Sequence, residues 1–364
     1  VQKGYCEETD YRGDSRMINN YNAYSFADLI NIISAIGDSA RKEERVPPVL
    51  WFRGHRMYDW DLRPTLFRKI QTTDLKLEEN ARIENFIAKN NQFFMQTPAS
   101  EAEWLEVMQH HDVSTRLLDW SESAAHSLIF TLEYFFKPDA HFNIDRINAM
   151  PCMWVFEPQK WNKYVIEQVI KSNAKYAIYD MCLNTQERNI VDQKLWNLSK
   201  NLNKLVIKSA EHLSWLFNLQ RIERWAEEFR NSGRSGFGKE PDSYYLYLLL
   251  YVIYLLKEEV SVGEIPPLAV TLPYNSERIR AQKGVFTVFP QYQNDTKLQN
   301  AAKMGVHLDA MQNMTPINHC LHRIKLFNVD RIAYEMMNQG MNISWIYPEM
   351  PVVANEIESR RITV

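Results

Sequence analysis

One short stretch of this chain concentrates the side chains that could do chemistry. Residues 109–120 bring an amide, two imidazoles, a guanidinium and carboxylate groups into a single run, Gln-His-His-Asp-Val-Ser-Thr-Arg-Leu-Leu-Asp-Trp. Polar groups held between buried elements must be satisfied by one another, by the backbone or by a ligand. We interpret the run as a ligand site. The alternative is a polar network that only fixes the neighbouring helices.

Apolar patterns on both sides of this run predict helices. Residues 101–108 have acidic side chains in the first turn and place Trp104 and Leu105 on one face, as an amphipathic helix requires. Beyond the run, Ser121 is a suitable N-cap, and apolar residues follow at helical spacing as far as Phe136. The polar run is therefore predicted to be a short connection between two buried helices.

A second group of candidates follows a short apolar segment. Residues 47–52 read as a buried strand opened by prolines, and this strand runs directly into Arg53 and Gly54. A cation at the end of a buried strand, next to a glycine that permits close backbone approach, can be aimed into a cleft to hold an anion. A solvated strand end is the alternative. Arg63 lies shortly afterwards, among aromatic residues in a turn-rich segment.

Composition narrows the class of protein. The 364 residues are 45% hydrophobic and 24% charged with a net charge of −3, which is typical of a soluble globular protein and gives no overall field that would attract nucleic acid or a membrane surface. The longest apolar run, residues 244–256, is shorter than the roughly 20 residues that span a bilayer. The cysteines are scattered without a CxxC pair or a signal peptide, which favours reduced thiols and a cytoplasmic location: Cys6, Cys152, Cys182 and Cys320.

The nine histidines do not form a metal-binding pattern. His110 and His111 are adjacent, so on a helix they point about 100° apart. His319 and His322 fall in a strand-like run, where this spacing places them on opposite faces. Neither pair has the spacing of a zinc site, and we predict no metal.

Two nucleotide-binding motifs are excluded. The glycine-rich residues 233–239 match the first part of a P-loop, but Glu240 stands where a magnesium-binding Ser or Thr is needed and Pro241 follows. The segment is therefore interpreted as a loop between helices. No GxGxxG follows a predicted strand, which argues against a dinucleotide-binding Rossmann domain.

The order of predicted strands and helices indicates an α+β fold. Strands are expected early, in the middle and late in the chain, so the predicted sheet is a split mixed sheet assembled from distant segments. Residues 1–24 are polar and are expected to be loose or strapped onto the surface. Four parts are proposed: an N-terminal helical segment 1–47, a core 48–157, a largely helical insertion or second lobe 158–262, and a C-terminal part 263–364 that completes the sheet.

The motifs of the core resemble those of the FRG domain family, named for a Phe/Tyr-Arg-Gly motif. They occur in the family's order: Trp51-Phe52-Arg53-Gly54, Leu62-Arg63-Pro64-Thr65-Leu66-Phe67-Arg68, Gln109-His110-His111 and Thr115-Arg116-Leu117-Leu118-Asp119-Trp120-Ser121. The chain departs from the family pattern at His55, Asp112 and Ser114, where Gln, Gly and Pro are usual. Asp112 and Ser114 imply a less tightly turned connection. The family occurs in bacteria and phages, which implies a role in bacterial conflict or defence.

A weaker resemblance links the chain to arginine-type ADP-ribosyltransferases. In that family an arginine at the end of the first strand holds NAD, a hydroxyl-bearing segment follows, and a late loop carries Glu or Gln. Arg53, residues 115–121 and Gln282 fall in this order. The resemblance implies NAD binding with ADP-ribosyltransferase or NAD-processing activity. Gln282 stands where a catalytic Glu is expected, and an amide stabilises a ribosyl cation poorly, so Asp119 is the alternative.

These arguments lead to a functional hypothesis with two rivals. The hypothesis is an enzyme or enzyme-like protein that binds NAD or a related nucleotide as its small-molecule ligand, without a metal. The rivals are a non-catalytic module that senses a ligand or binds a protein partner, and a buried structural network with function in the helical lobe. The proposed catalytic residues are Asp119, Gln282 and His110, and the proposed ligand-binding residues are Arg53, Gly54, Arg63, Gln109, Thr115, Arg116, Trp120 and Arg278.

Overall fold

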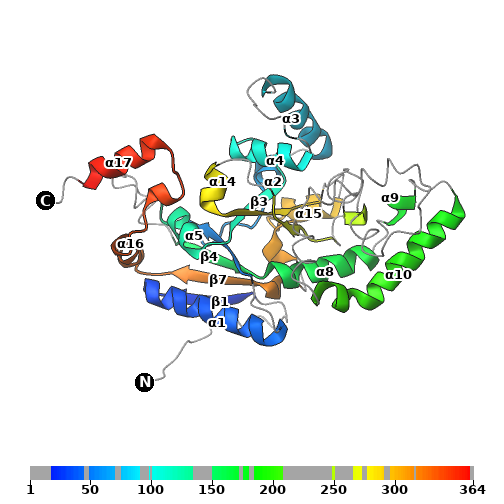
Figure 1. The fold of residues 1–364 in the computed structure, drawn as a ribbon, viewed down its shortest axis with the longest axis horizontal. Coiled ribbons are helices and arrows are strands. Elements are labelled where there is room, and N and C mark those ends of the chain that lie inside the picture. The colour runs from blue at the N-terminus through cyan, green and yellow to red at the C-terminus, as the bar shows by residue number, and fades with distance from the viewer. Residues whose placement is uncertain are drawn as a thin grey trace.

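A mixed sheet forms the centre of the fold in the computed structural model (Figure 1). Within the residues that the structure describes, the sheet has seven strands in the order β1-β7-β4-β2-β3-β6-β5. β1 and β7 run parallel, and all other neighbours run antiparallel. The strands are β1 (Asn19–Ala23), β2 (Trp51–His55), β3 (Leu117–Ser121), β4 (Cys152–Phe156), β5 (Leu268–Val270), β6 (Gly284–Val288) and β7 (Leu321–Leu326). The α+β fold with a mixed sheet built from distant segments is confirmed.

The structure describes most of the chain, with gaps. The described residues are 18–44, 49–69, 75–90, 98, 101–133, 150–171, 175–179, 184–207, 248–250, 265–272, 277–290, 296–314 and 317–360. The glycine-rich residues 233–239 and most of the apolar run 244–256 lie outside them, as do Cys6 and Cys182. No helix of the described part is long and apolar enough to cross a membrane.

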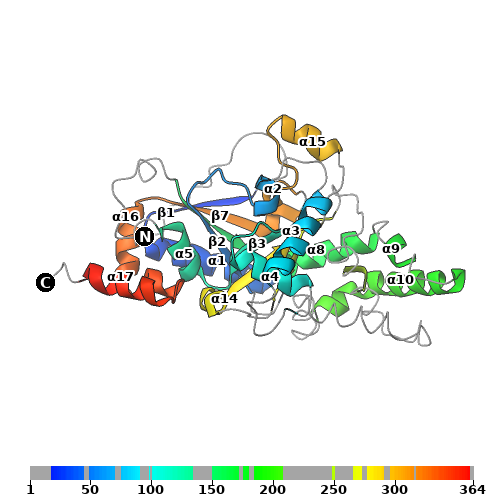
Figure 2. The same ribbon diagram turned by 90° about the horizontal axis from the view of Figure 1, so that it is seen from above.

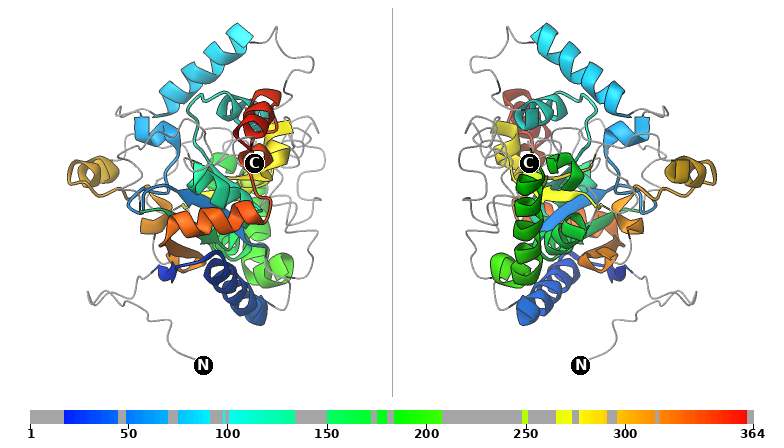
Figure 3. Two further views of the ribbon diagram at one scale, coloured as in Figure 1. Left: turned by 90° about the vertical axis from the view of Figure 1, so that its left-hand side faces the viewer. Right: turned by 90° about the vertical axis from the view of Figure 1, so that its right-hand side faces the viewer.

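Helices cover both faces of the sheet (Figure 2). The longer ones are α1 (Phe26–Glu44), α3 (Leu75–Asn90), α4 (Glu101–His110), α8 (Pro158–Lys171), α10 (Thr185–Ile207), α16 (Val329–Asn338) and α17 (Met350–Arg360). The shorter ones are α2 (Thr65–Lys69), α5 (Ala124–Thr131), α9 (Lys175–Tyr179), α14 (Glu277–Gln282) and α15 (Thr296–Lys303), with 3-10 turns η2 (Met311–Asn313), η3 (Ile317–Cys320) and η4 (Ile343–Trp345). Helices α10 and α17 lie at opposite ends of the long axis in Figure 1, and Figure 3 shows the molecule from each of these two ends.

Strand β4 shows why both faces are covered. Its five residues are all buried, and alternate side chains enter different cores: Cys152, Trp154 and Phe156 pack with α3, α4, α8 and α10, whereas Met153 and Val155 pack with α1, α5 and α16. A strand buried on both faces reads as a continuous apolar run, as residues 152–156 do.

Two of the predicted elements are wrong. Leu117–Ser121 is strand β3, which pairs with β6 over five positions. The polar run 109–120 therefore leads from helix α4 into a strand and does not connect two helices directly. Helix α5 begins at Ala124, and its N-cap is Ser123, whose side chain accepts a hydrogen bond from the His126 N–H, rather than Ser121. The apolar side chains on either side of Asp119 drive this outcome, because both faces of β3 are largely buried.

The polar N-terminal segment also contains a strand that was not predicted. Residues 1–24 are expected to be loose or strapped onto the surface, whereas Asn19–Ala23 forms β1 and pairs with β7 in register from Asn19 opposite His322 to Ala23 opposite Leu326. Its sequence, Asn-Asn-Tyr-Asn-Ala, gives only a weak strand signal, because Tyr21 and Ala23 are its only apolar residues; both pack in the core on one face of the sheet, and pairing with β7 completes the strand.

The sheet splits between β2 and β3. These strands share a single register pair, Phe52 opposite Ser121, whereas β2 pairs with β4 at five positions and β3 with β6 at five. Helix α5 packs against β2 beside the split, where Gly54 allows close approach. Arg53 and Gly54 therefore lie inside β2 and next to the opening, rather than beyond the end of the strand as predicted.

We expect Gly54→Ala to destabilise the fold. A Cβ at this position would lie 1.9 Å from Thr131 Oγ1 and 2.3 Å from the Ser127 carbonyl oxygen, so α5 would have to move. Overpacking of this kind costs roughly 1–3 kcal/mol or more, measurable as a lower urea midpoint. The matched control is Gly37→Ala in α1, where the nearest atom, Leu50 Cδ1, is 3.8 Å away and alanine should stabilise the helix by about 0.5–1 kcal/mol. Equal effects of the two substitutions would contradict the packing of α5 on β2.

Candidate functional site

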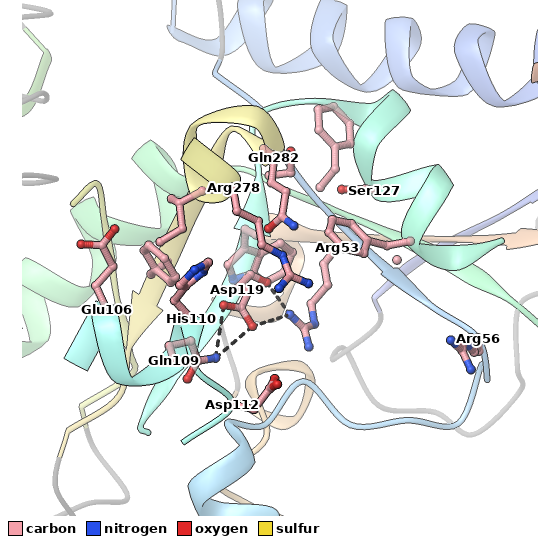
Figure 4. A pocket seen from close by; sticks show the side chains of 18 of the residues that line it. Arg53, Arg56, Glu106, Gln109, His110, Asp112, Asp119, Ser127, Arg278 and Gln282 are labelled. Carbon is pink, nitrogen blue, oxygen red and sulfur yellow. Dashed lines mark hydrogen bonds and ion pairs between the residues drawn. The ribbon is translucent and has the colours of Figure 1, made fainter. Parts of the chain in front are cut away.

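A cavity of about 360 Å³ lies beside the split in the sheet (Figure 4). Its walls come from β2, the end of α4, β3, α5 and α14, so residues far apart in the sequence meet there. Eight of the predicted site residues line it: Arg53, Gly54, Gln109, His110, Asp119, Trp120, Arg278 and Gln282. The side chains of Arg53, Arg278 and Gln109 approach Asp119 from three different elements (Figure 4).

Arg53 reaches from β2 across the split to β3. Its Nη1 donates to the backbone oxygen of Asp119, and the same nitrogen lies 3.7 Å from Asp119 Oδ2. Its Nε donates to His55 Nε2 at 3.2 Å. Burial lowers the pKa of Arg53, and the Asp119 carboxylate opposes this shift. The guanidinium therefore stays charged, and the groups around Nε and Nη1 fix its orientation.

A chain of hydrogen bonds fixes the Asp119 carboxylate. The Thr115 hydroxyl donates to Gln109 Oε1, which leaves the Gln109 amide nitrogen to donate to both carboxylate oxygens of Asp119, at 3.2 and 3.0 Å. Thr115 Oγ1 also accepts from the Leu117 N–H at 3.2 Å, which ties the chain to the start of β3. The Asp119 side chain is nevertheless 51% exposed, so its carboxylate remains accessible from the cavity.

Helix α4 ends in a tight turn that presents Gln109 and His110 to the cavity. The Val113 N–H bonds to the Met108 carbonyl at 2.9 Å and the Asp112 N–H to the Gln109 carbonyl at 3.2 Å, the two bonds of a Schellman motif. Asp112 occupies its left-handed position with φ of 58°. The expectation of a less tightly turned connection is therefore wrong. Aspartate takes up this conformation more readily than most residues, so it can replace the usual glycine.

His55 supports Arg53 from the buried side. It is 3% exposed, and its Nδ1 lies 3.3 Å from the indole nitrogen of Trp154, while its Nε2 receives the Arg53 Nε bond. Burial, with added repulsion from Arg53 and Arg68, holds the pKa of His55 well below 6.5. A neutral imidazole can accept one of these two bonds and an imidazolium neither, so the surroundings favour the neutral ring.

The α14 side of the cavity is held by the C-terminal part of the chain. The Arg278 guanidinium lies 4.5 Å from the centre of the Tyr347 ring and 3.9 Å from Glu349 Oε1. The Gln282 amide nitrogen donates to the Ile346 carbonyl oxygen at 2.9 Å. Gln282 therefore ties η4 to the cavity wall, and its amide carries no charge to offer a cationic ligand atom.

His110 is a titratable group that lines the cavity with these cations. Burial lowers its pKa, and His111 and Arg278 lower it further. The imidazole is therefore neutral at pH 7 and can accept a proton from a bound molecule. Within the described residues no hydrogen bond to the His110 ring is found; its one ring contact is with His111, at 4.9 Å between centroids.

Three predicted ligand-binding residues lie away from the cavity. Arg116 is completely buried, with Nε 3.3 Å from Glu79 Oε2, and Arg63 Nη2 pairs with Asp309 at 2.8 Å. Thr115 is also buried and acts through Gln109. Of the four arginines proposed to bind the ligand, Arg53 and Arg278 line the cavity, whereas Arg63 and Arg116 do not.

Sequence reasoning missed several residues that line the cavity. Glu106 is buried in α4, one turn before Gln109 and His110, and the helical spacing of these three could have indicated a shared face. Trp60 and Arg56 follow β2 in a turn, where spacing gives no such signal. Within the described residues, no cluster of three or more His, Cys, Asp or Glu side chains could hold a metal ion.

Comparison with known proteins identifies part of the chain. Residues 49–140 match the model of the FRG domain family. The match spans β2, β3 and the helices from α2 to α5, and ends before β4. No curated protein and no solved structure matches the chain. Arg278 and Gln282 come from outside the matched residues, so the cavity is completed by the C-terminal part of the chain.

We expect the stabilising effect of His55 to be lost in acid. The pKa of His55 is lower in the folded protein than in the unfolded chain. Below about pH 6.5 the unfolded chain therefore binds a proton that the folded protein does not. The free energy of unfolding then falls by up to about 1.4 kcal/mol per pH unit because of this one group. The free energy of unfolding of the wild type and of His55→Gln should therefore differ less at pH 5 than at pH 8. A pH-independent difference would show that His55 is not held neutral by the fold.

We expect Arg116→Met to lower the free energy of unfolding strongly and to have no direct effect on ligand affinity. Removing one partner of a fully buried ion pair takes the Arg116 charge away from the buried Glu79 carboxylate and costs about 3–5 kcal/mol. The double substitution Arg116→Met with Glu79→Leu should recover much of this loss, because it removes both buried charges. Urea unfolding of the three proteins tests this. A stable single variant with weakened ligand binding would instead support the predicted ligand role of Arg116.

Proposed function

We propose that this protein, which contains an FRG domain, binds a nucleotide-like ligand in the cavity at the split of its sheet, with NAD as the leading candidate. The observation that carries the proposal is the meeting of two guanidiniums, Arg53 and Arg278, in one cavity with the carboxylate of Asp119. Guanidiniums bind phosphate groups through paired, charge-assisted hydrogen bonds. Arg53 engages Nε and Nη1 within the protein, which leaves Nη2 available to a ligand.

The cavity carries both signs of charge. Arg53, Arg56 and Arg278 line it together with Glu106 and Asp119. The guanidiniums attract an anionic ligand and the carboxylates weaken its binding, whereas NAD in its oxidised form combines anionic phosphates with a cationic nicotinamide ring. This charge distribution supports NAD over a simple phosphate ester. The role of the ring charge can be tested by comparing the affinities for NAD and NADH, because NADH has the same phosphates and an uncharged ring.

The size of the cavity supports a ligand that is partly enclosed. Its volume of about 360 Å³ is near the lower end of the roughly 300–1,000 Å³ that small-molecule sites occupy. A mononucleotide half would fill it, and the rest of a dinucleotide would extend over the rim. Gln109 and His110 line the cavity and would orient the bound half by hydrogen bonding.

NAD processing is the second candidate function, and the half-exposed Asp119 carboxylate favours it. In such a reaction the bond between ribose C1′ and the nicotinamide nitrogen breaks, its electron pair neutralises the ring, and water or an acceptor adds to C1′ and loses a proton. A fixed carboxylate stabilises the ribosyl cation, and neutral His110 can take the proton. Because Gln282 is uncharged and bonded to Ile346, we assign the electrostatic role to Asp119. NAD consumption would fit the role in bacterial defence that the family resemblance implies.

Titration calorimetry with NAD and NADH tests the proposal. We expect the wild type to bind NAD more tightly than NADH, and Arg278→Gln to weaken both by roughly 10- to 150-fold, since a hydrogen bond to a charged group contributes about 1.5–3 kcal/mol. Arg278 is preferred for this test because its side chain is 35% exposed, so its replacement leaves no buried charge unpaired. The control is Arg331→Gln on α16, an ion-paired arginine outside the cavity, which should bind normally.

Nicotinamide release separates catalysis from sensing. Release by the wild type that is lost in Asp119→Asn would establish processing, whereas binding without release supports the non-catalytic sensor. Absence of binding by the wild type to either dinucleotide, or equal loss in Arg278→Gln and Arg331→Gln, would overturn the proposal. Thermal unfolding of each variant shows whether it is folded under the conditions of the assay.

A further inference from the structure

Trp60 offers an accessible aromatic surface at the cavity. It lines the cavity and is 48% exposed, although the chain on both sides of it is fixed. The backbone N–H of Trp60 donates a hydrogen bond to the Met57 carbonyl oxygen at 3.3 Å. Immediately after it, Asp61 and Leu62 are both held by the Gln312 side chain, through Asp61 Oδ1 and the Leu62 N–H. An ordered backbone that carries a half-exposed indole can bind an aromatic group without a large entropy cost.

The other aromatic residues of the cavity are less suited to this role. The Trp120 indole was expected to contact the ligand, but it is 3% exposed, donates to Thr287 Oγ1 and lies 4.8 Å from the Phe156 ring. Phe130 meets the Tyr347 ring nearly at right angles. Trp60 meets the His55 ring at 61°, and its exposure leaves at least one face of the indole open.

The position of Trp60 relative to Arg53 suits a nucleotide. Both residues contact the same imidazole: Arg53 Nε is 3.2 Å from His55 Nε2, and the Trp60 ring centroid is 6.0 Å from that of His55. A flat group on the indole would therefore lie close to the guanidinium that is proposed to hold phosphate. In a nucleotide, the base and the phosphate are joined at this short range through the ribose.

We infer that Trp60 is the stacking surface for the aromatic base of the bound nucleotide. The inference deepens the proposed function and rests on it. Every nucleobase has a π-face, so stacking on an indole favours a base without selecting its sequence identity. Trp60 would thus distinguish nucleotides from sugar phosphates, while Arg53 and Arg278 hold the phosphate groups common to both.

Binding of AMP and of ribose 5-phosphate tests the inference, because the two differ only by the base. We expect Trp60→Ala to weaken AMP binding by roughly 5- to 150-fold, the range found when a base loses its stacking partner, and to leave ribose 5-phosphate binding unchanged. Trp60→Phe should keep most of the AMP affinity. The matched control is Trp196→Ala, which removes a 60% exposed tryptophan on α10 that lies under Lys200 and outside the cavity.

The outcomes separate this inference from the proposed function. If Trp60→Ala binds AMP like the wild type, or loses AMP and ribose 5-phosphate equally, then Trp60 is not the base surface, although Arg278-dependent binding could still stand. If the wild type binds neither AMP nor NAD, the proposed function itself fails. Thermal unfolding of Trp60→Ala must match that of Trp60→Phe, so that a loss of AMP affinity reflects stacking and not misfolding.

Discussion

The candidate site depends on one interaction, the reach of Arg53 from β2 to β3 across a gap in the sheet. The two strands share a single register pair, so the backbone of β3 beside Asp119 is not fully engaged in the ladder with β2. The Arg53 guanidinium supplies a bond to the Asp119 carbonyl oxygen where a strand neighbour would otherwise do so. The split in the sheet and the cationic wall of the cavity are therefore one feature: the strands separate, and a charged side chain spans the space between them.

Groups from three parts of the chain keep this arrangement in place. His55 fixes Arg53 from within β2, Gln109 at the end of α4 fixes the Asp119 carboxylate, and Gln282 on α14 links the wall to the Ile346 carbonyl. The Ser121 hydroxyl, at the one point where β2 and β3 pair, donates to the Gln282 carbonyl at 2.7 Å. Because these bonds join segments distant in sequence, the cavity forms only once the whole sheet has assembled.

The sequence predicted well those elements whose burial has a clear period. The helix at 101–108 falls in this class, and the family motifs directed attention to Arg53, Gln109 and Asp119, which line one cavity. Other features depend on contacts that no local pattern encodes. The strand at 19–23 exists through its pairing with β7. Arg116 looks the same in sequence as a ligand-binding arginine, and only its distant partner Glu79 shows that it is buried in the core.

The polar network and the ligand site were posed as alternatives, and the described side chains show how one cluster can serve as both. A network that only fixed the helices would bury and pair its charges, as Arg116 and Glu79 do with no side-chain exposure. Thr115 and Gln109 likewise hold α4 to β3, yet the carboxylate at the end of their chain is 51% exposed in a cavity beside two guanidiniums. The Gln109 amide orients the Asp119 carboxylate, but because that carboxylate is open to solvent, this interaction adds little to the free energy of unfolding. The same arrangement is what binding requires, because a fixed, accessible charge loses little entropy when a ligand arrives.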